Sequence, residues 1–475
     1  MFDQIKRLAR HSAIYGLGGT VSRILAVLLL PLYTAYLEPR DFGAVGVLIA
    51  LSAVLVTILR GGISSAFFRF YFDSNDPARR LLVLRTSFWF TMASATAGLA
   101  AGALLAAPIA DLVGVDDPWL VRAAFVGVWA QMNYEQLTSL FRVEERSMAF
   151  VGATLVNVVV TIAATVLLVV GFEQGALGVI VGNWIGTLVV YLGLLGYRRE
   201  QLGLQFDRPL LREMQRFGWP LVPAALALIA VNFSDRFFLS HISGLDEVGV
   251  YELGVRVSSA MVLLLTAFRT AWPAFAYSIE DDEEAKRTYA FVLTYLVYAA
   301  CWLALALAVL SPWIVRLLAS DSSFYPGSRV VGLLAFGTAS YAAYIVMAIG
   351  VGRARRTQFN WVITGIAAAV NVILNVALIP SYGMMGAAVA TASAYVVLFA
   401  GMTYWAQRVF PVPYQWRRVA TAAGAAVGLT VLAKVIDAPL WLALPLALLY
   451  PLALVPLGFY LPAERRRFRT LARLG

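Results

Sequence analysis

The sequence predicts an all-α polytopic membrane protein with fourteen transmembrane helices, arranged as two six-helix lobes related by an internal repeat and followed by two further helices. Three observations predict this class. Hydrophobic residues make up 61% of the chain and charged residues only 13%, and the mean hydropathy is +0.77, far above that of a soluble domain. Apolar runs of about 20 residues, the length that crosses the hydrocarbon core, recur along the chain. Short motifs of the first half also return in the second half.

Two motif pairs mark the repeat. Asp41-Phe42-Gly43 lines up with Glu247-Val248-Gly249 at an offset of 206 residues, and the GxxG motif that starts at Gly175 lines up with the one that starts at Gly383 at an offset of 208. Two nearly equal offsets indicate a duplicated unit. In membrane proteins such repeats are typical of transporters whose substrate site lies between the halves.

The predicted spans follow the repeat in order. Those of the first half lie near residues 12–37, 43–70, 82–107, 119–141, 150–171 and 176–197, those of the second half near 217–241, 248–277, 288–310, 328–351, 359–379 and 383–406, and two more near 417–436 and 440–461. We expect an N-terminal lobe with its linker at 1–211, a C-terminal lobe at 212–411, and the added spans with a basic tail at 412–475. The second and eighth spans are longer than a bilayer requires, so we expect them to tilt.

The distribution of basic residues predicts the orientation. With a cytoplasmic N-terminus, cytoplasmic segments hold 26 of the 37 lysines and arginines and the outside loops hold five. This imbalance predicts that both termini are cytoplasmic. It also explains the net charge of +10 without nucleic acid as a partner. The single cysteine, Cys301, can support neither a disulfide framework nor a metal site.

Arginines are the main candidates for binding. An ionisable group inside a bilayer normally faces a polar cavity or a partner. Six arginines fall within predicted spans, namely Arg23, Arg60, Arg69, Arg236, Arg256 and Arg269, against three acids, Glu135, Asp235 and Glu252. A cavity lined in this way is net positive, and guanidinium groups bind phosphate through a planar fork.

These arginines predict a site for a diphosphate substrate, with Arg23, Arg60 and Arg256 deepest in their spans and Arg69 and Arg269 as further candidates. The alternative is contact with lipid headgroups. We favour that alternative for Arg69 and Arg269, near the cytoplasmic ends, and for Arg236 beside Asp235.

A second cluster is a candidate for ion coupling. Asn371 and Asn375 are four residues apart and share one face of the eleventh span. Asp235 and Thr391 lie on the seventh and twelfth spans. One carboxylate with amide and hydroxyl oxygens suits a hard cation such as Na⁺, and Asp235 alone suits a proton. Hydrogen bonding between helices is the alternative.

Catalytic motifs are missing from the sequence. It has no Walker loop, HExxH, GxSxG or dinucleotide fingerprint, which argues against an ATP-driven pump and against a cofactor other than a coupling ion. The outside loops are short, which argues against a membrane polymerase or ligase. We therefore expect a protein that is not an enzyme.

The chain resembles polysaccharide flippases of the multidrug/oligosaccharidyl-lipid/polysaccharide (MOP) exporter superfamily. The likeness is carried in order by the segments 18–23, 37–43, 62–71, 235–239 and 247–251. It implies two helical lobes that open alternately to the two sides of a bacterial inner membrane. The implied cargo is an oligosaccharide on polyprenyl diphosphate, moved from the cytoplasmic to the periplasmic leaflet. Membrane lipids and downstream polymerase or export proteins are the implied partners of a monomer.

The resemblance also implies roles for residues. In the related flippase of peptidoglycan precursors, arginines of the first, second and eighth spans line the cavity, and Arg23, Arg60 and Arg256 occupy those spans here. That relative has a Na⁺ site among its seventh, eleventh and twelfth spans, which Asp235, Asn371, Asn375 and Thr391 imitate. A multidrug or metabolite antiporter of the same superfamily remains the alternative. Such proteins typically have twelve spans and use acids to bind cationic drugs.

Overall fold

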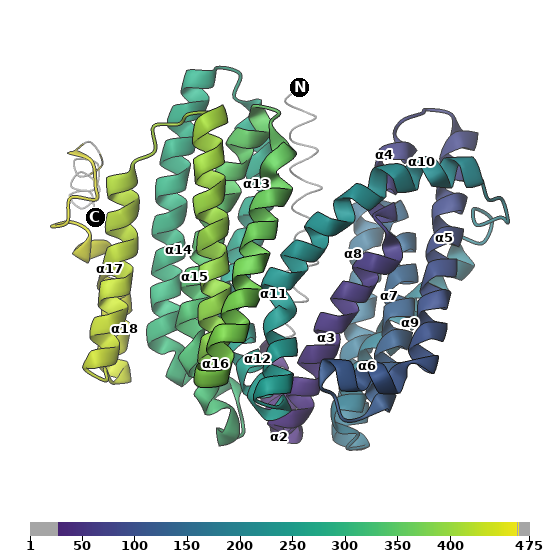
Figure 1. Cartoon of the computed structure of the whole chain (residues 1–475), viewed down its shortest axis with the longest axis horizontal. Helices are drawn as coiled ribbons and strands as arrows, with labels where there is room; N and C mark the ends of the chain where they lie inside the picture. Colours follow the sequence, from purple (N-terminus) through teal and green to yellow (C-terminus); the bar gives the residue numbers. More distant parts are fainter. Residues whose placement is uncertain (1–26, 463, 465–475) are drawn as a thin grey trace. The chain divides into compact units, whose positions relative to one another are not determined.

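The computed structural model describes residues 27–462 and 464, and all regular structure among them is helical (Figure 1). The chain divides into two compact units. Unit 1 contains the described residues up to Leu253 together with Leu318–Phe324 and Ala368–Ala390. Unit 2 contains Gly254–Leu317, Tyr325–Ala367 and the described residues from Thr391 onward.

Unit 1 holds the helices of the first half and the first two helices of the second half. They are α2 (Leu30–Tyr36), α3 (Pro39–Arg60), α4 (Ile63–Tyr71), α5 (Pro77–Leu104), α6 (Ala106–Val113), α7 (Pro118–Val143), α8 (Ser147–Val166) with the π-helical turn η1 (Leu167–Gly171), α9 (Gly175–Tyr197), α10 (Arg208–Gly218), the 3₁₀ turn η2 (Trp219–Leu221), α11 (Val222–Ile242) and α12 (Leu245–Ser258) up to Leu253.

Local sequence explains where several of these helices begin. Asp76, Asp117 and Asp207 precede α5, α7 and α10, and each carboxylate accepts a hydrogen bond from an amide of the first turn. Each is followed within two residues by a proline at the start of the helix. An aspartate cap and an early proline both favour helix initiation, because the first amides have no partner within the helix.

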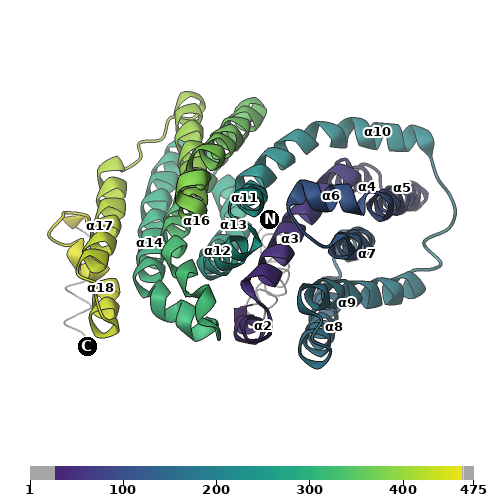
Figure 2. The ribbon, with the colours of Figure 1, turned by 60° about the horizontal axis from the view of Figure 1, so that its bottom comes forward.

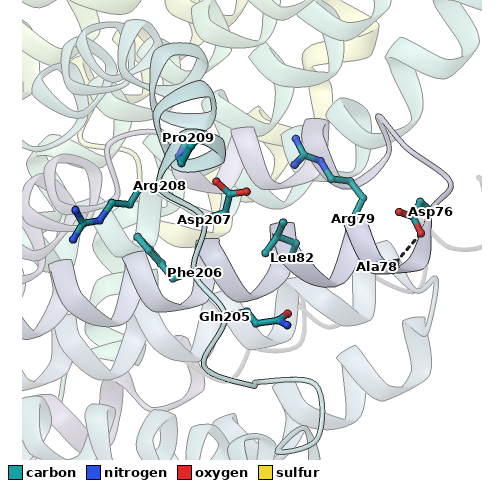
Figure 3. A pocket seen from close by; sticks show the side chains of 9 residues that line it. All are labelled: Asp76, Ala78, Arg79, Leu82, Gln205, Phe206, Asp207, Arg208 and Pro209. Atoms are coloured by element: carbon teal, nitrogen blue, oxygen red, sulfur yellow. Dashed lines mark hydrogen bonds between the residues drawn. The ribbon is translucent and has the colours of Figure 1, made fainter.

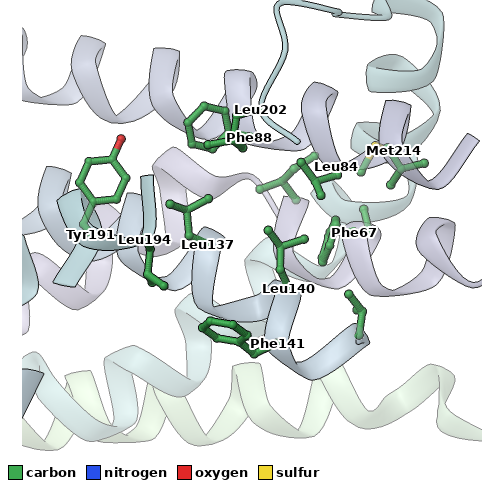
Figure 4. Close-up of a cluster of buried hydrophobic side chains, with 14 of the residues drawn as sticks. Phe67, Leu84, Phe88, Leu137, Leu140, Phe141, Tyr191, Leu194, Leu202 and Met214 are labelled. Carbon is green, nitrogen blue, oxygen red and sulfur yellow. The ribbon is translucent and has the colours of Figure 1, made fainter. Parts of the chain in front are cut away.

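The core of unit 1 lies among α4, α5, α7 and α9. Figure 4 shows its side chains, among them Phe67, Phe88, Leu137, Leu140 and Tyr191, each no more than 2% exposed. Helix α9 packs against both α7 and α8, and α7 packs against α5 (Figure 1, Figure 2). The amphipathic helix α10 packs on α4 and α5, and α11 packs on α3.

Unit 2 holds most of the second half. Its helices are α13 (Ala260–Ser278), α14 (Asp282–Leu318) up to Leu317, part of the 3₁₀ turn η3 (Ser322–Gly327), α15 (Ser328–Arg353), the 3₁₀ turn η4 (Thr357–Phe359), α16 (Asn360–Val409) outside Ala368–Ala390, α17 (Trp416–Val435) and α18 (Leu440–Ala453). Arg418 at the start of α17 pairs with Glu464 at 2.9 Å and donates to Tyr295 of α14 at 3.2 Å, which ties the chain's last helices to α14.

The predicted class of an all-helical polytopic membrane protein is confirmed. Within the described residues, nine helices are long and apolar enough to cross a membrane, or ten if α5 and α6, bent by 83°, form one span. Most of the first predicted span falls in residues 1–26, outside the described residues. Helix α16 contains both the eleventh and the twelfth predicted spans, which meet at Gly383, where the backbone leaves helical geometry.

The two long predicted spans are each divided between two helices. The second predicted span breaks into α3 and α4 at Gly61 and Gly62, both with positive φ. A side chain at Gly62 would collide with the backbone of Gly218 in α10, so α10 packs where the break occurs. The eighth predicted span is divided at Ser259 into α12 and α13, although Ser259 keeps right-handed helical φ and ψ. The hydropathy profile shows neither helix end, because the residues on both sides are apolar.

Candidate functional site

Arg60 lies at the end of α3, next to the break. The left-handed backbone of Gly61 ends the helix there. The Arg60 guanidinium donates to Glu135 Oε2 of α7 at 2.6 Å, and Gln131 donates to the other carboxylate oxygen at 2.9 Å. The side chains of Arg60 and Glu135 are 15% and 35% exposed. The structure therefore pairs this predicted diphosphate-binding arginine with one of the three span acids.

The other two acids share a second arginine. Arg236 of α11 donates through Nη1 to Asp235 Oδ1 at 2.7 Å and through Nη2 to Glu252 Oε2 of α12 at 3.1 Å. The Tyr251 hydroxyl donates to Asp235 Oδ2 at 2.5 Å. All four residues are buried. Gly46 of α3 lies against the group, since a Cβ there would be in van der Waals contact with the Glu252 side chain at 3.4 Å.

This buried group changes the interpretation of Arg236. Its side chain is 5% exposed and lies between two carboxylates, so the expectation that Arg236 contacts lipid headgroups is wrong. With both acids ionised, two carboxylates and one guanidinium carry one net negative charge. In the sequence, Arg236 and Glu252 are 16 residues apart and show no sign of pairing. Their contact depends on how α11 and α12 fold back on each other, which spacing alone does not reveal.

The predicted coupling residues Asn371 and Asn375 meet on α16, and they share a partner that sequence reasoning missed. Ser234 of α11 donates to Asn371 Oδ1 at 2.7 Å, and Asn375 Nδ2 donates to the same oxygen at 3.1 Å and to Ser234 Oγ at 3.2 Å. Both asparagines are fully buried. Asn375 Oδ1 has no hydrogen-bond partner among the described residues. A buried acceptor without a donor suits a cation, because a cation supplies the missing positive charge.

The other two predicted coupling residues relate differently to this cluster. Asp235 follows Ser234 on α11, but its carboxylate accepts from Arg236 and Tyr251. Thr391 is 5% exposed and belongs to unit 2. Because adjacent residues of a helix face different directions, the sequence carried no signal that Ser234 rather than Asp235 would meet the two asparagines.

The remaining predicted arginines have separate surroundings. Arg23 lies outside the described residues. Arg69 is exposed on α4, with its guanidinium 5.2 Å from the centre of the Phe217 ring. Arg256 is half-buried on α12 and Arg269 is exposed on α13, both in unit 2. Among the predicted substrate arginines, Arg60 is thus the one for which an ion pair with an acid, Glu135, is defined by its distance.

A surface cavity of about 880 Å³ lies elsewhere in unit 1, at the beginnings of α5 and α10 (Figure 3). Arg79 and Arg208 line it, and so do the capping residues Asp76 and Asp207. The two carboxylates already accept from the Ala78 and Leu210 amides, at 3.0 Å each. Two acids that occupy the helix starts make this cavity a poor site for a diphosphate.

Comparison with protein families gives two matches. A family described as polysaccharide biosynthesis protein matches residues 8–279, and the MatE family matches residues 220–377. A curated relative, the uncharacterized membrane protein MJ1068 of Methanocaldococcus jannaschii, is 24% identical over 204 residues. That match covers 41% of this chain and 39% of the relative, well under half of its length.

Comparison with solved structures identifies the fold. The lipid II flippase MurJ in an inward closed conformation aligns over 93% of this chain and 97% of its own, with a TM-score of 0.75 and 13% identity. An inward-facing multidrug resistance MATE family transporter of the MOP superfamily aligns over 87% of this chain and 96% of its own, with a TM-score of 0.64 and 15% identity. The fold is therefore that of MOP-superfamily transporters.

Proposed function

Because the chain belongs to the polysaccharide biosynthesis protein family, we propose that it is a flippase for an oligosaccharide linked to polyprenyl diphosphate. The flippase moves this lipid from the cytoplasmic to the periplasmic leaflet by alternating access. The match of the family to residues 8–279, more than half of the chain, carries the proposal. The likeness of the fold to a lipid II flippase supports it. The chain is a transporter rather than an enzyme.

The proposed architecture is that expected from the sequence. Fourteen spans form an N-terminal lobe within 1–211, a C-terminal lobe within 212–411 and an added pair within 412–475. Both termini are cytoplasmic, and the protein acts as a monomer in a bacterial inner membrane. Its partners are the lipid-linked oligosaccharide, membrane lipids and the downstream polymerase or export proteins.

The proposed substrate contacts are guanidinium groups. Arg23, Arg60 and Arg256 bind the diphosphate, and Arg69 and Arg269 are further candidates nearer the ends of their spans, where lipid headgroups are the alternative partner. A diphosphate that enters a low-dielectric cavity loses hydration, and fixed guanidinium groups replace it. Glu135 holds the Arg60 guanidinium at 2.6 Å before substrate arrives. A carboxylate partner fixes the direction of the fork, and incoming phosphate oxygens compete for the same donors.

The proposed coupling ion is Na⁺ or a proton. The amide and hydroxyl oxygens of Ser234, Asn371 and Asn375 fit a small hard cation, with Asp235 supplying nearby negative charge and Thr391 a further oxygen. For a proton, Asp235 is the carrier in that cluster. Bound at these residues, the ion would supply a positive charge that links α11 to α16.

A second candidate function is a cation-coupled multidrug or metabolite antiporter. The match of the MatE family to residues 220–377 favours it. Its expected acids are present, but Glu135, Asp235 and Glu252 are all paired with arginines. Paired acids are poor receptors for a cationic drug, because the drug must displace a tethered guanidinium.

The test compares alanine and lysine at the arginines. Alanine at Arg23, Arg60 or Arg256 should reduce flipping severely at near-normal protein level, so that lipid-linked oligosaccharide accumulates on the cytoplasmic leaflet. Lysine should rescue only partly, because it keeps the charge but loses the fork. Arg122→Ala, in the first turns of α7 at the predicted outside end of the fourth span, is the matched control. Normal surface polysaccharide in all three alanine variants would overturn the arginine mechanism, and efflux of cationic drugs by the wild type would favour the antiporter.

A further inference from the structure

The two motif pairs of the internal repeat meet each other in unit 1. The carboxylate of Asp41, from the first pair, lies against Gly175, from the second pair, and the carboxylate of Glu247 lies against Gly383 in the same way. Gly175 and Gly383 have nearly the same positive φ, +51° and +50°. Each acid stands in the first turn of its helix, α3 or α12. The two halves therefore share an acid–glycine contact as well as the sequence motifs.

The Glu247 contact is a helix cap supplied from another helix. Glu247 Oε1 accepts a hydrogen bond from the Met384 amide at 2.6 Å. Met384 begins the helical segment that follows the break at Gly383, where the first amides lack partners within the helix. A negative charge at such a position is also favoured by the helix dipole. Glu247 lies at the start of α12 as well, so one carboxylate serves two helix beginnings.

In the first half Asp41 lies at the corresponding place by proximity to Gly175, without a hydrogen bond to an α9 amide among the described residues. Asp41 Oδ2 and Oδ1 lie 3.1 and 3.3 Å from the position that a Cβ would take at Gly175, the first residue of α9. Asp41 and Glu247 are both half-buried. At Gly383 a Cβ would collide with the Glu247 carboxylate. Glycine thus provides both the positive φ and the space for the acid at these positions.

The helices that carry the two acids also touch through their backbones. A side chain at Gly43 of α3 would collide with the Leu245 carbonyl of α12, and one at Gly249 of α12 would collide with the Pro39 carbonyl of α3. These contacts are reciprocal at the offset of 206 residues. Two carboxylates and the close backbone contact at Gly43 and Gly249 therefore link four helix beginnings. These are the beginnings of α3, α9, α12 and the segment after Gly383.

We propose that Asp41 and Glu247 are paired positioning residues of transport. Asp41 ties the beginning of α3 to that of α9, and Glu247 ties the beginning of α12 to the segment that starts at Met384, so that each tied pair moves as one body while the protein alternates. All four beginnings lie at predicted outside ends of spans. The effect on transport rests on the proposed flippase function, whereas the ties themselves do not.

Hydrogen exchange of the purified protein tests the ties. In Glu247→Gln, which keeps the side-chain size and removes the charge, the amides of 384–387 should exchange roughly fivefold faster than in the wild type, because a cap is weakened. Those of 176–178 should not change. Asp41→Asn should show the reverse. Asp246→Asn is the matched control, since Asp246 lies in the same first turn of α12 but is exposed.

A glycine pair gives a second comparison that does not depend on the acids. Gly383→Ala and Gly244→Ala both place alanine at positive φ, but only Gly383 faces a carboxylate, while a Cβ at Gly244 meets open space. Exchange at 384–387 should rise in Gly383→Ala and stay unchanged in Gly244→Ala. If amide exchange at 176–178 is unchanged in Asp41→Asn and that at 384–387 is unchanged in Glu247→Gln, the ties are overturned.

Transport then tests the positioning role. Glu247→Gln and Asp41→Asn should each slow flipping several-fold at normal protein level, and Asp246→Asn should not. Faster local exchange with unchanged flipping would overturn the role in transport. If the wild type flips no lipid-linked oligosaccharide, the proposed function falls, and the exchange data alone then decide the ties.

Discussion

Arg60 of α3 donates a hydrogen bond to Glu135 of α7 at 2.6 Å, so a guanidinium proposed to bind a diphosphate already has an anionic partner. The pair is partly accessible, with side chains 15% and 35% exposed, whereas Arg236 between Asp235 and Glu252 is 5% exposed. This difference separates two roles for arginines in the same bundle. An accessible pair can exchange its partner for phosphate, and a buried one holds helices together.

The first prediction concerns the Arg60 pair. Glu135→Gln should tighten apparent binding of lipid-linked oligosaccharide several-fold and slow its release, because the guanidinium no longer has a competing carboxylate. Arg60→Ala should weaken binding instead. A flippase assay in proteoliposomes, with substrate concentration varied, separates the two effects. Gln131→Ala, which removes only a neutral donor to Glu135, is the control.

A structural role for the same pair predicts another pattern. Both variants would then lose activity alike and unfold more readily, by about 1–2 kcal/mol for a partly exposed pair. The Arg60→Ala/Glu135→Gln double variant would recover that stability. Equal losses with such recovery would contradict the substrate role of Arg60.

The second prediction concerns Arg236. Arg236→Ala leaves two buried carboxylates without their shared cation, so it should cost about 3–5 kcal/mol, the usual effect of breaking a buried ion pair. Thermal unfolding in detergent and the amount of protein in the membrane measure this loss. Arg69→Ala is the control, since its exposed contact with Phe217 is worth at most about 1 kcal/mol. Normal stability of Arg236→Ala would contradict the structural role of the buried group.

The third prediction concerns orientation. In a Cys301→Ala background, single cysteines at Asp117 and Asp246 should react with an impermeant maleimide in intact cells, because both residues are exposed and lie in predicted outside segments. A cysteine at Arg212, exposed on α10 in the linker, should react only after the membrane is opened. The opposite labelling pattern would reverse the topology.

The sequence predicted the helical membrane class well and showed the repeated motifs, because both can be recognised from local sequence. Apolar runs predict spans by length alone. The motifs at Asp41 and Glu247 were visible as a repeat. Their meeting with Gly175 and Gly383 was not predicted. It depends on helices more than 130 residues apart in the chain packing side by side.

Breaks within spans and ion pairs between spans were harder to predict. The hydropathy profile does not show the break at Gly61 and Gly62. The break is seen in the backbone conformation and in the packing of α10 against it. The pairs Arg60–Glu135 and Arg236–Glu252 join different helices. Which faces of two helices meet is decided by turn geometry and packing, so charged residues could be counted from the sequence but not paired.

The last prediction concerns the coupling ion. If Na⁺ binds at Ser234, Asn371 and Asn375, replacing KCl by NaCl at constant ionic strength should raise the melting temperature of the purified protein. Binding stabilises the folded state by about 2.7 kcal/mol at a hundredfold excess over Kd. Asn375→Ala should remove this Na⁺-dependent shift, because it deletes the buried acceptor that has no partner among the described residues.

Asn133 of α7 offers a matched control for this experiment. It is also fully buried, and its Oδ1 likewise has no partner within the described part of the chain. Asn133→Ala should therefore lower stability to a similar extent and leave the Na⁺ shift intact. Asp235→Asn should flatten the dependence of transport on the ion gradient. A Na⁺ shift that persists in Asn375→Ala would exclude this cluster as the Na⁺ site. Transport by Asp235→Asn with unchanged dependence on both Na⁺ and pH would reduce the cluster to helix packing.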